Sequence, residues 1–245
     1  MESLNCGAQS GIKLYIVRHG RTVFNIEGKT QGFSDSPLTD EGTKQAIQIG
    51  RGLSDIEFIK AFSGNLERQK STAKYILSQN KNKIPPLTEL YGLREWSFGG
   101  FEGKPIFNMW EPICKKHNVP MEEMKKNYKK LIEILGYKEL ADEIYANDAD
   151  KKAENYDTIF KRLNEAMDEI IKVSCEECAK LKSNSANVLI VSSGMMITTM
   201  LHVFGKEQYK GEIITNCSAS ILKYKDGKFD LEAAGDLSFL ERGAF

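Results

Sequence analysis

An arginine and a histidine stand together at the end of an apolar run near the start of the chain. Leu14-Tyr15-Ile16-Val17 is followed at once by Arg18-His19-Gly20. A short β-branched run that ends in glycine predicts a buried strand, and open α/β sheets bind ligands at the carboxyl ends of their strands. An imidazole held through one ring nitrogen can attack phosphorus with the other, and a guanidinium binds phosphate oxygens in pairs. The spacing therefore indicates phosphoryl chemistry.

Further polar residues come in an order that suits the same chemistry. Asn25 precedes a long polar loop that begins with Gln31-Gly32, and Arg68 comes just after a second predicted strand. Glu95 stands beside Trp96, and an apolar setting raises the pKa of a carboxyl group toward the value that a proton donor needs. Downstream, Val188-Leu189-Ile190-Val191-Ser192-Ser193-Gly194 repeats the strand-to-turn pattern without the histidine.

In this order the residues resemble the histidine phosphatase superfamily, also called the phosphoglycerate mutase-like family, from Leu14 to Leu240. The resemblance implies that His19 becomes phosphorylated, that Arg18 and Arg68 clamp the phosphate, and that Glu95 gives a proton to the leaving oxygen. It implies substrate contacts from Asn25, Gln31 and Gly32 as well. The segments 31–39 and 95–103 are similar to those of the broad-specificity phosphatases, and the basic, tyrosine-bearing segment of the cofactor-dependent mutases is missing.

The sequence departs from the family at Ser193, where the second catalytic histidine is expected. Losing one preorganised donor costs about a hundred- to a thousandfold in rate, although the Ser193 hydroxyl can still donate to a phosphate oxygen. His202 lies roughly 13 Å further along a predicted helix and cannot easily replace it, and His117 falls in the predicted cap. An engineered substitution, a natural attenuation and a binding-only descendant of the family remain open as explanations.

The resemblance implies a two-step hydrolysis of phosphate monoesters through a phosphohistidine on His19, with no metal and no cofactor. A phosphoglycerate mutase and a catalytically silent phospho-ligand binding protein are the alternatives. The substrate expected is a small phosphorylated metabolite, and three lysines of the cap are candidate anion contacts: Lys104, Lys115 and Lys116.

Alternating helix and strand patterns predict the elements that position these residues. Strands are expected at 12–17, 58–62, 87–90 and 187–192, a hairpin at 220–224 and 228–233, and helices at 39–53, 66–78, 121–135, 155–181 and 195–204. The fold class is α/β, a three-layer α/β/α sandwich with a mostly parallel central sheet. We expect a single domain over 1–245, with 101–156 as a helical cap insertion.

Composition limits the partners and the compartment. The 245 residues include 34 basic and 34 acidic side chains, and the net charge of zero argues against nucleic-acid or membrane binding. No apolar segment suits a signal peptide or a membrane span, so we expect a cytoplasmic protein. Five cysteines fit reduced thiols, with Cys175 and Cys178 as ordinary helix residues. Apolar edge strands make a homodimer possible.

Overall fold

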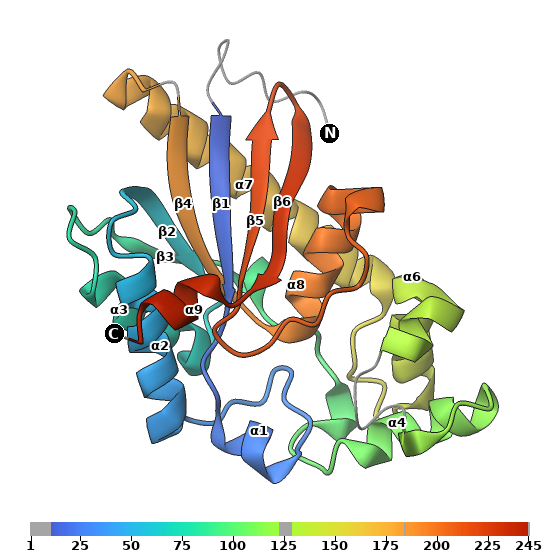
Figure 1. The fold of residues 1–245 in the computed structure, drawn as a ribbon. Helices are drawn as coiled ribbons and strands as arrows, with labels where there is room; N and C mark the ends of the chain where they lie inside the picture. The colour runs from blue at the N-terminus through green and yellow to red at the C-terminus, as the bar shows by residue number, and fades with distance from the viewer. Residues whose placement is uncertain (1–10, 123–128, 184, 245) are drawn as a thin grey trace.

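A central sheet of six strands organises the chain (Figure 1). The computed structural model describes residues 11–122, 129–183 and 185–244. The strand order is β3-β2-β4-β1-β5-β6, in which the first four strands are parallel and the last two form an antiparallel hairpin. Their bounds are β1 Gly11–Arg18, β2 Phe58–Ser63, β3 Leu87–Glu89, β4 Ser185–Ser192, β5 Ala219–Lys225 and β6 Lys228–Asp236.

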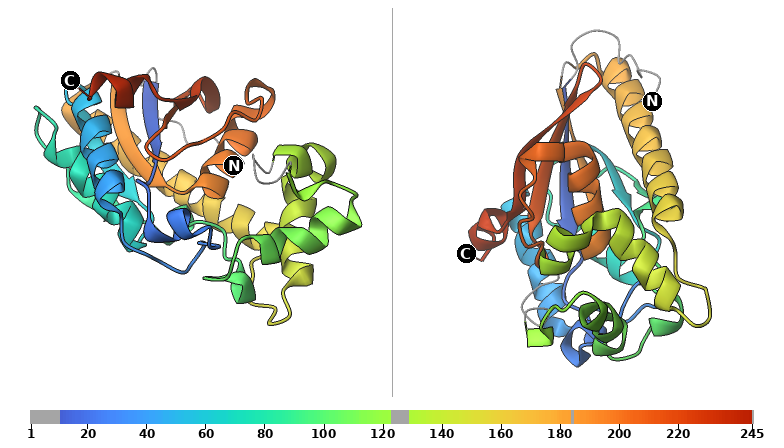
Figure 2. Two further views of the ribbon diagram at one scale, coloured as in Figure 1. Left: turned by 60° about the horizontal axis from the view of Figure 1, so that its bottom comes forward. Right: turned by 90° about the vertical axis from the view of Figure 1, so that its right-hand side faces the viewer.

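Helices cover both faces of the sheet, which confirms the predicted α/β class. The bounds of the longer helices are α2 Asp40–Gly52, α3 Glu67–Ser78, α4 Phe107–Lys116, α6 Lys129–Asn147 and α7 Tyr156–Leu181. The short ones are α1 Val23–Glu27, α8 Gly194–Met200 and α9 Ser238–Arg242. Figure 2 shows α2 and α9 on one side of the sheet and α7 on the other.

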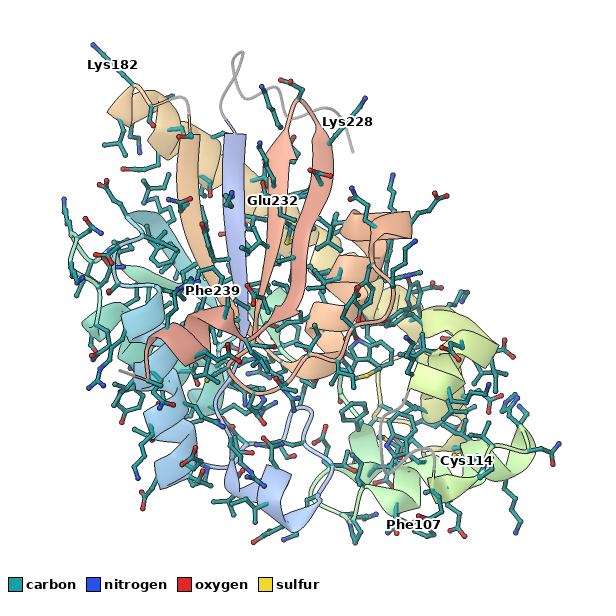
Figure 3. All side chains as sticks on the ribbon, viewed as in Figure 1. Phe107, Cys114, Lys182, Lys228, Glu232 and Phe239 are labelled. Carbon is teal, nitrogen blue, oxygen red and sulfur yellow. The ribbon has the colours of Figure 1, made fainter. Side chains whose placement is uncertain are left out.

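The alternation of side chains along β1 divides the core into two layers. Leu14 and Ile16 pack with α7, α8 and the helices of the cap region, whereas Tyr15 and Val17 pack with α2, α3 and α9. Phe239 of α9 meets Tyr15 edge-on, with ring centroids 6.1 Å apart (Figure 3). Apolar burial on both faces explains why the central strands read as continuous hydrophobic runs.

The carboxyl ends of the parallel strands meet at one edge of the sheet, where α1, α4 and α6 gather around them (Figure 1). The α6 segment is interrupted at Gly136, whose φ of 72° is not helical. Helices α4 and α6, which lie in the segment expected as a cap, share one apolar cluster with the sheet and are packed against the core. None of the described helices is both long and apolar enough to cross a membrane.

The cysteine expectation holds only in part. Cys114, Cys178 and Cys217 are free and buried, but Cys175 is disulfide-bonded. The expectation of a reduced thiol at Cys175 is therefore wrong, because spacing along one helix carries no information about disulfide pairing.

Candidate active site

Two neighbouring strand ends bring His19 and Ser193 together. The parallel register pairs Arg18 of β1 with Ser192 of β4, so the next residues of the two strands leave the sheet side by side. The His19 amide donates to the Ser192 carbonyl at 3.0 Å. His19 is 3% exposed and Ser193 is 1% exposed. The two strand ends singled out in the sequence therefore form one buried centre.

The ring of His19 is oriented for attack through Nε2. Nδ1 lies 2.8 Å from the carbonyl oxygen of Gly20, and because a carbonyl only accepts, Nδ1 carries the proton and Nε2 the lone pair. Burial, followed by the charges of Arg68 and Arg18, lowers the pKa of His19 well below its ordinary value. The imidazole is therefore neutral near pH 7, the form in which it is a nucleophile.

The two arginines approach this imidazole from different elements. Arg18 donates from Nη1 to the carbonyl of Ile214 at 2.7 Å, and its buried Nε has no hydrogen-bond partner among the described residues. Arg68, at the first turn of α3, is 1% exposed. The loop over residues 31–35 engages both outer nitrogens of Arg68, through the carbonyls of Gly32 and Ser34 and through Asp35 Oδ1 at 2.7, 2.8 and 3.0 Å.

Arg68 is therefore held in place by protein atoms, while its Nε, like that of Arg18, has no hydrogen-bond partner among the described residues. Asp35 fixes the start of α3 as well, because its Oδ2 accepts from the Glu67 amide at 2.5 Å. A cation at a helix N-terminus opposes the helix dipole, and Asp35 supplies the compensating negative charge. Both outer nitrogens of Arg68 are engaged within the protein, so a phosphate beside His19 would interact with Arg68 through the field of its charge.

The loop residues predicted to contact substrate differ in their surroundings. Asn25 completes a capping box with Thr22 at the start of α1, and its Oδ1 also accepts from Asn216 Nδ2 at 3.3 Å. Gln31 bonds Thr22 and Ser36 through its amide. The Gly32 N–H donates to Glu102, and the Gly32 carbonyl accepts from Arg68, so both of its backbone groups are engaged within the protein.

The buried carboxyl group of Glu95 lies against the N-terminal end of α8. Its oxygens accept from the amides of Trp96, Met195 and Met196, each at 2.9 Å. These bonds and the arginine charges favour the carboxylate, but burial outweighs them and raises the pKa of Glu95 above the ordinary carboxyl range. A carboxyl group with a raised pKa can both give and take a proton.

One cavity of about 120 Å³ joins several of the predicted residues. Its polar lining includes Arg18, Asn25, Gln31 and Glu95, and its apolar lining comes largely from the cap side. The complete lining is Arg18, Asn25, Lys29, Thr30, Gln31, Glu95, Phe98, Ile106, Met109, Trp110, Gly194 and Met195. His19, Arg68 and Ser193 do not line it, so the cavity brings together the predicted proton donor and one arginine but not the predicted nucleophile.

The other histidines and the cap lysines lie elsewhere. His202 stacks on Tyr137, with ring centroids 4.6 Å apart, and lines a separate cavity of about 500 Å³ that Arg18 also borders. His117 contacts Glu143 at 3.2 Å, and Lys116 pairs with the same carboxylate. Lys104 and Lys115 are exposed and do not line the smaller cavity. Neither histidine lines the smaller cavity.

Several residues that build the site escaped the sequence analysis. The Glu102 carboxylate accepts hydrogen bonds from the amides of Gly32, Phe33, Ser34 and Phe98. Asn216 Nδ2 donates to the His19 carbonyl at 2.9 Å. The guanidinium of Arg162 on α7 binds the carbonyls of Gly92, Arg94 and Glu95 and pairs with Glu154. Glu102 and Asp35 lie in the two segments already singled out, but no spacing rule connects Arg162 or Asn216 with them.

Comparison with known proteins places this geometry in a family. Residues 14–130 and 118–237 match the histidine phosphatase superfamily (branch 1). The crystal structure of a phosphoglycerate mutase from Bacillus anthracis str. Sterne superposes with a TM-score of 0.83 and 32% identity, covering 97% of this chain and 98% of that one.

Curated relatives carry two kinds of name. The broad-specificity phosphatase YOR283W of Saccharomyces cerevisiae is 28% identical over 240 residues, 96% of this chain and 90% of its own length. The probable phosphoglycerate mutase GpmB of Escherichia coli is 25% identical over 241 residues, 95% of this chain and 97% of its own length. With the family match spanning most of the sequence, the chain belongs to the histidine phosphatase superfamily.

Proposed function

We propose that the chain hydrolyses phosphate monoesters through a phosphohistidine on His19, at a rate reduced by Ser193. The observation that carries the proposal is the state of the His19 ring. Its Nδ1 is tied to the Gly20 carbonyl, its pKa is lowered, and the cations Arg18 and Arg68 stand close enough to perturb it. A neutral nucleophile between two cations suits attack on a phosphate dianion.

In the first step His19 Nε2 forms a bond to phosphorus and the bond from phosphorus to the ester oxygen breaks. Glu95 protonates the leaving oxygen and becomes a carboxylate. In the second step Glu95 takes a proton from water, the water oxygen bonds to phosphorus, and the phosphorus–nitrogen bond breaks. Its electron pair returns to Nε2, inorganic phosphate leaves, and both residues regain their starting states. Arg18 and Arg68 balance the charge on the phosphoryl oxygens throughout.

Ser193 supplies a neutral hydroxyl where the family resemblance implies a second imidazole. A hydroxyl gives one uncharged hydrogen bond, whereas a protonated imidazole gives a charge-assisted one of roughly twice the strength. Loss of one preorganised donor typically costs about a hundred- to a thousandfold in rate. Binding of the substrate is expected to survive better than its turnover.

A phosphoglycerate mutase is the second candidate, supported by the name of the Bacillus anthracis structure. The two activities use the same phosphohistidine and differ in what accepts the phosphoryl group. Incubation with 2-phosphoglycerate separates them, because a mutase yields 3-phosphoglycerate and a phosphatase yields glycerate and inorganic phosphate. A silent binding protein would yield neither product while still binding the ester.

Release of p-nitrophenol from p-nitrophenyl phosphate tests the proposal directly. We expect slow turnover by the chain and none by His19→Ala. His117→Ala is the matched control, since His117 contacts Glu143 in the cap region, and it should keep the parent rate. Binding of the ester without hydrolysis by the parent chain would refute the phosphatase assignment.

A further inference from the structure

Gln69 is a fully buried amide that touches Ser193. It follows Arg68 on α3, and its relative exposure is 0%. Its Nε2 lies 3.1 Å from the Leu93 carbonyl and 2.9 Å from Ser193 Oγ. The Leu93 carbonyl accepts from the Ser192 hydroxyl too, at 2.7 Å. The end of β4, the start of α3 and the loop before Glu95 are therefore joined through one amide.

The Leu93 carbonyl fixes the direction of each hydrogen bond. A carbonyl can only accept, so the amide must present its NH₂ group to Leu93 rather than its oxygen. The second hydrogen of that group then points to Ser193, whose Oγ accepts it. Among residues 11–122, 129–183 and 185–244, none accepts a hydrogen bond from the Ser193 hydroxyl. The described residues therefore leave this proton without an acceptor.

Gly64 makes room for this arrangement. A Cβ at Gly64 would stand 2.0 Å from Gln69 Oε1, so any larger residue would displace the amide. The same Oε1 is buried and has no hydrogen-bond partner among the described residues. An unpaired buried acceptor is costly, so packing alone does not explain an amide at this position. The two hydrogen bonds that its NH₂ group donates, to the Leu93 carbonyl and to Ser193, do.

We propose that Gln69 is a positioning residue that sets the Ser193 hydroxyl as a donor to the transferring phosphoryl group. The proposal rests on the proposed function, and it treats Gly64, Gln69 and Ser193 as one unit. The unit also limits substitution at position 193. An imidazole occupies more space around Cβ than a hydroxyl, and the Gln69 amide already stands in contact with that hydroxyl. A histidine there requires that Gln69 be shortened.

A double-mutant cycle on hydrolysis of p-nitrophenyl phosphate tests the positioning role. Ser193→Ala should lower kcat about tenfold, the size expected for one hydrogen bond to a charged group, with a smaller change in KM. Gln69→Met should lower kcat by several-fold in the parent and leave it unchanged in the Ser193→Ala background. If kcat of the double variant falls by the product of the two single losses, the proposal is overturned. Lys70→Met, one position along α3 and partly exposed, is the matched control.

Gly64→Ala displaces the amide without altering Gln69, and it keeps the test decisive if Gln69→Met does not fold. It should reproduce the loss in the parent and have no effect on kcat in Ser193→Ala. The lack of room for an imidazole at position 193 is tested separately. Ser193→His alone should not exceed the parent rate, whereas Ser193→His with Gln69→Ala should exceed it at least tenfold. Equal rates for the single and double variants would overturn that part.

Failure of the proposed function is distinguishable from failure of the Gln69 assignment. If the parent hydrolyses no ester, the phosphatase proposal fails, and the same cycle is measured as the affinity for orthovanadate by calorimetry. Weaker vanadate binding in Gln69→Met, with no further loss on adding Ser193→Ala, supports the positioning role. Independent losses contradict it.

Discussion

Glu95 is the residue whose removal separates proton donation from phosphate binding. Glu95→Gln keeps the size of the side chain but cannot protonate the leaving oxygen, so kcat/KM for alkyl phosphates, which covers only the steps up to the phosphohistidine, should fall about a hundred- to ten-thousandfold. The loss should be much smaller for p-nitrophenyl phosphate, whose leaving group is stable as an anion. Values of kcat/KM for both esters check this, because the second step, in which Glu95 acts as base, is the same for both and does not enter kcat/KM; equal losses in kcat/KM would show that Glu95 does not act as the acid.

The pH dependence follows from two pKa shifts of opposite direction. His19 must be neutral, and its pKa is lowered, so activity should persist on the acidic side of about pH 6.5 before it is lost by protonation. Glu95 must be protonated, and its pKa is raised, so activity should decline as the pH rises through that value. A profile of kcat/KM checks both limbs, and Glu95→Gln should abolish the alkaline one. An acidic limb above pH 7 would contradict the His19 assignment.

At the scale of residues, the sequence predicted the groups that lie at strand ends. His19 and Ser193 meet because each follows a strand, and parallel neighbours end at the same edge. Gln69 and Asn216 could not be found this way. Their partners lie 124 and 197 positions away in the chain, and an amide carries no charge or motif that singles it out.

Arg162 is the contact through which α7 holds the loop that carries Glu95. Arg162→Leu removes hydrogen bonds to the carbonyls of Gly92, Arg94 and Glu95 and leaves Glu154 buried without its cation. We expect a loss of about 3–5 kcal/mol in the free energy of unfolding, measured by urea denaturation. Lys161→Leu, the exposed neighbour, should change it little. Equal effects of the two changes would refute the anchoring role.

The β5–β6 hairpin depends on its two-residue turn. Lys225 pairs with Lys228, and Asp226 and Gly227 between them have φ values of 50° and 75°. A Cβ at Gly227 would meet open space, so Gly227→Ala tests backbone strain alone, at about 1–2 kcal/mol of stability. Thermal unfolding measures it, with Lys228→Ala as the control. No loss would mean that the turn relaxes.

For single helices and strands, the alternation of hydrophobic residues predicted the type of each segment better than the residues at which it begins and ends. The strand expected at 12–17 spans Gly11–Arg18, and the helix expected from Thr39 begins at Asp40 with the Thr39 hydroxyl as its cap. The helix expected over 195–204 is α-helical over Gly194–Met200 and continues as a π-helical turn over Leu201–Gly205. The helix expected over 121–135 falls partly outside the described residues.

For the whole molecule, the order of helices and strands was enough to predict an α/β sandwich, and the sheet order confirms it. The position of the cap helices was not predictable, since it depends on which apolar faces meet in space. The single-domain organisation and the homodimer stay predictions. The edge strand β6 carries Lys228 and Glu232 (Figure 3), and charged side chains on an edge oppose strand pairing.

Every step of the proposed mechanism requires that a phosphoryl group pass through His19. The most direct measurement is a rapid-quench reaction with a ³²P-labelled phosphate ester, stopped in alkaline detergent, followed by counting of the protein-bound label. We expect label that survives alkali, is lost in acid and is missing from His19→Ala. Label that persists in His19→Ala, or hydrolysis by that variant at the parent rate, would contradict it.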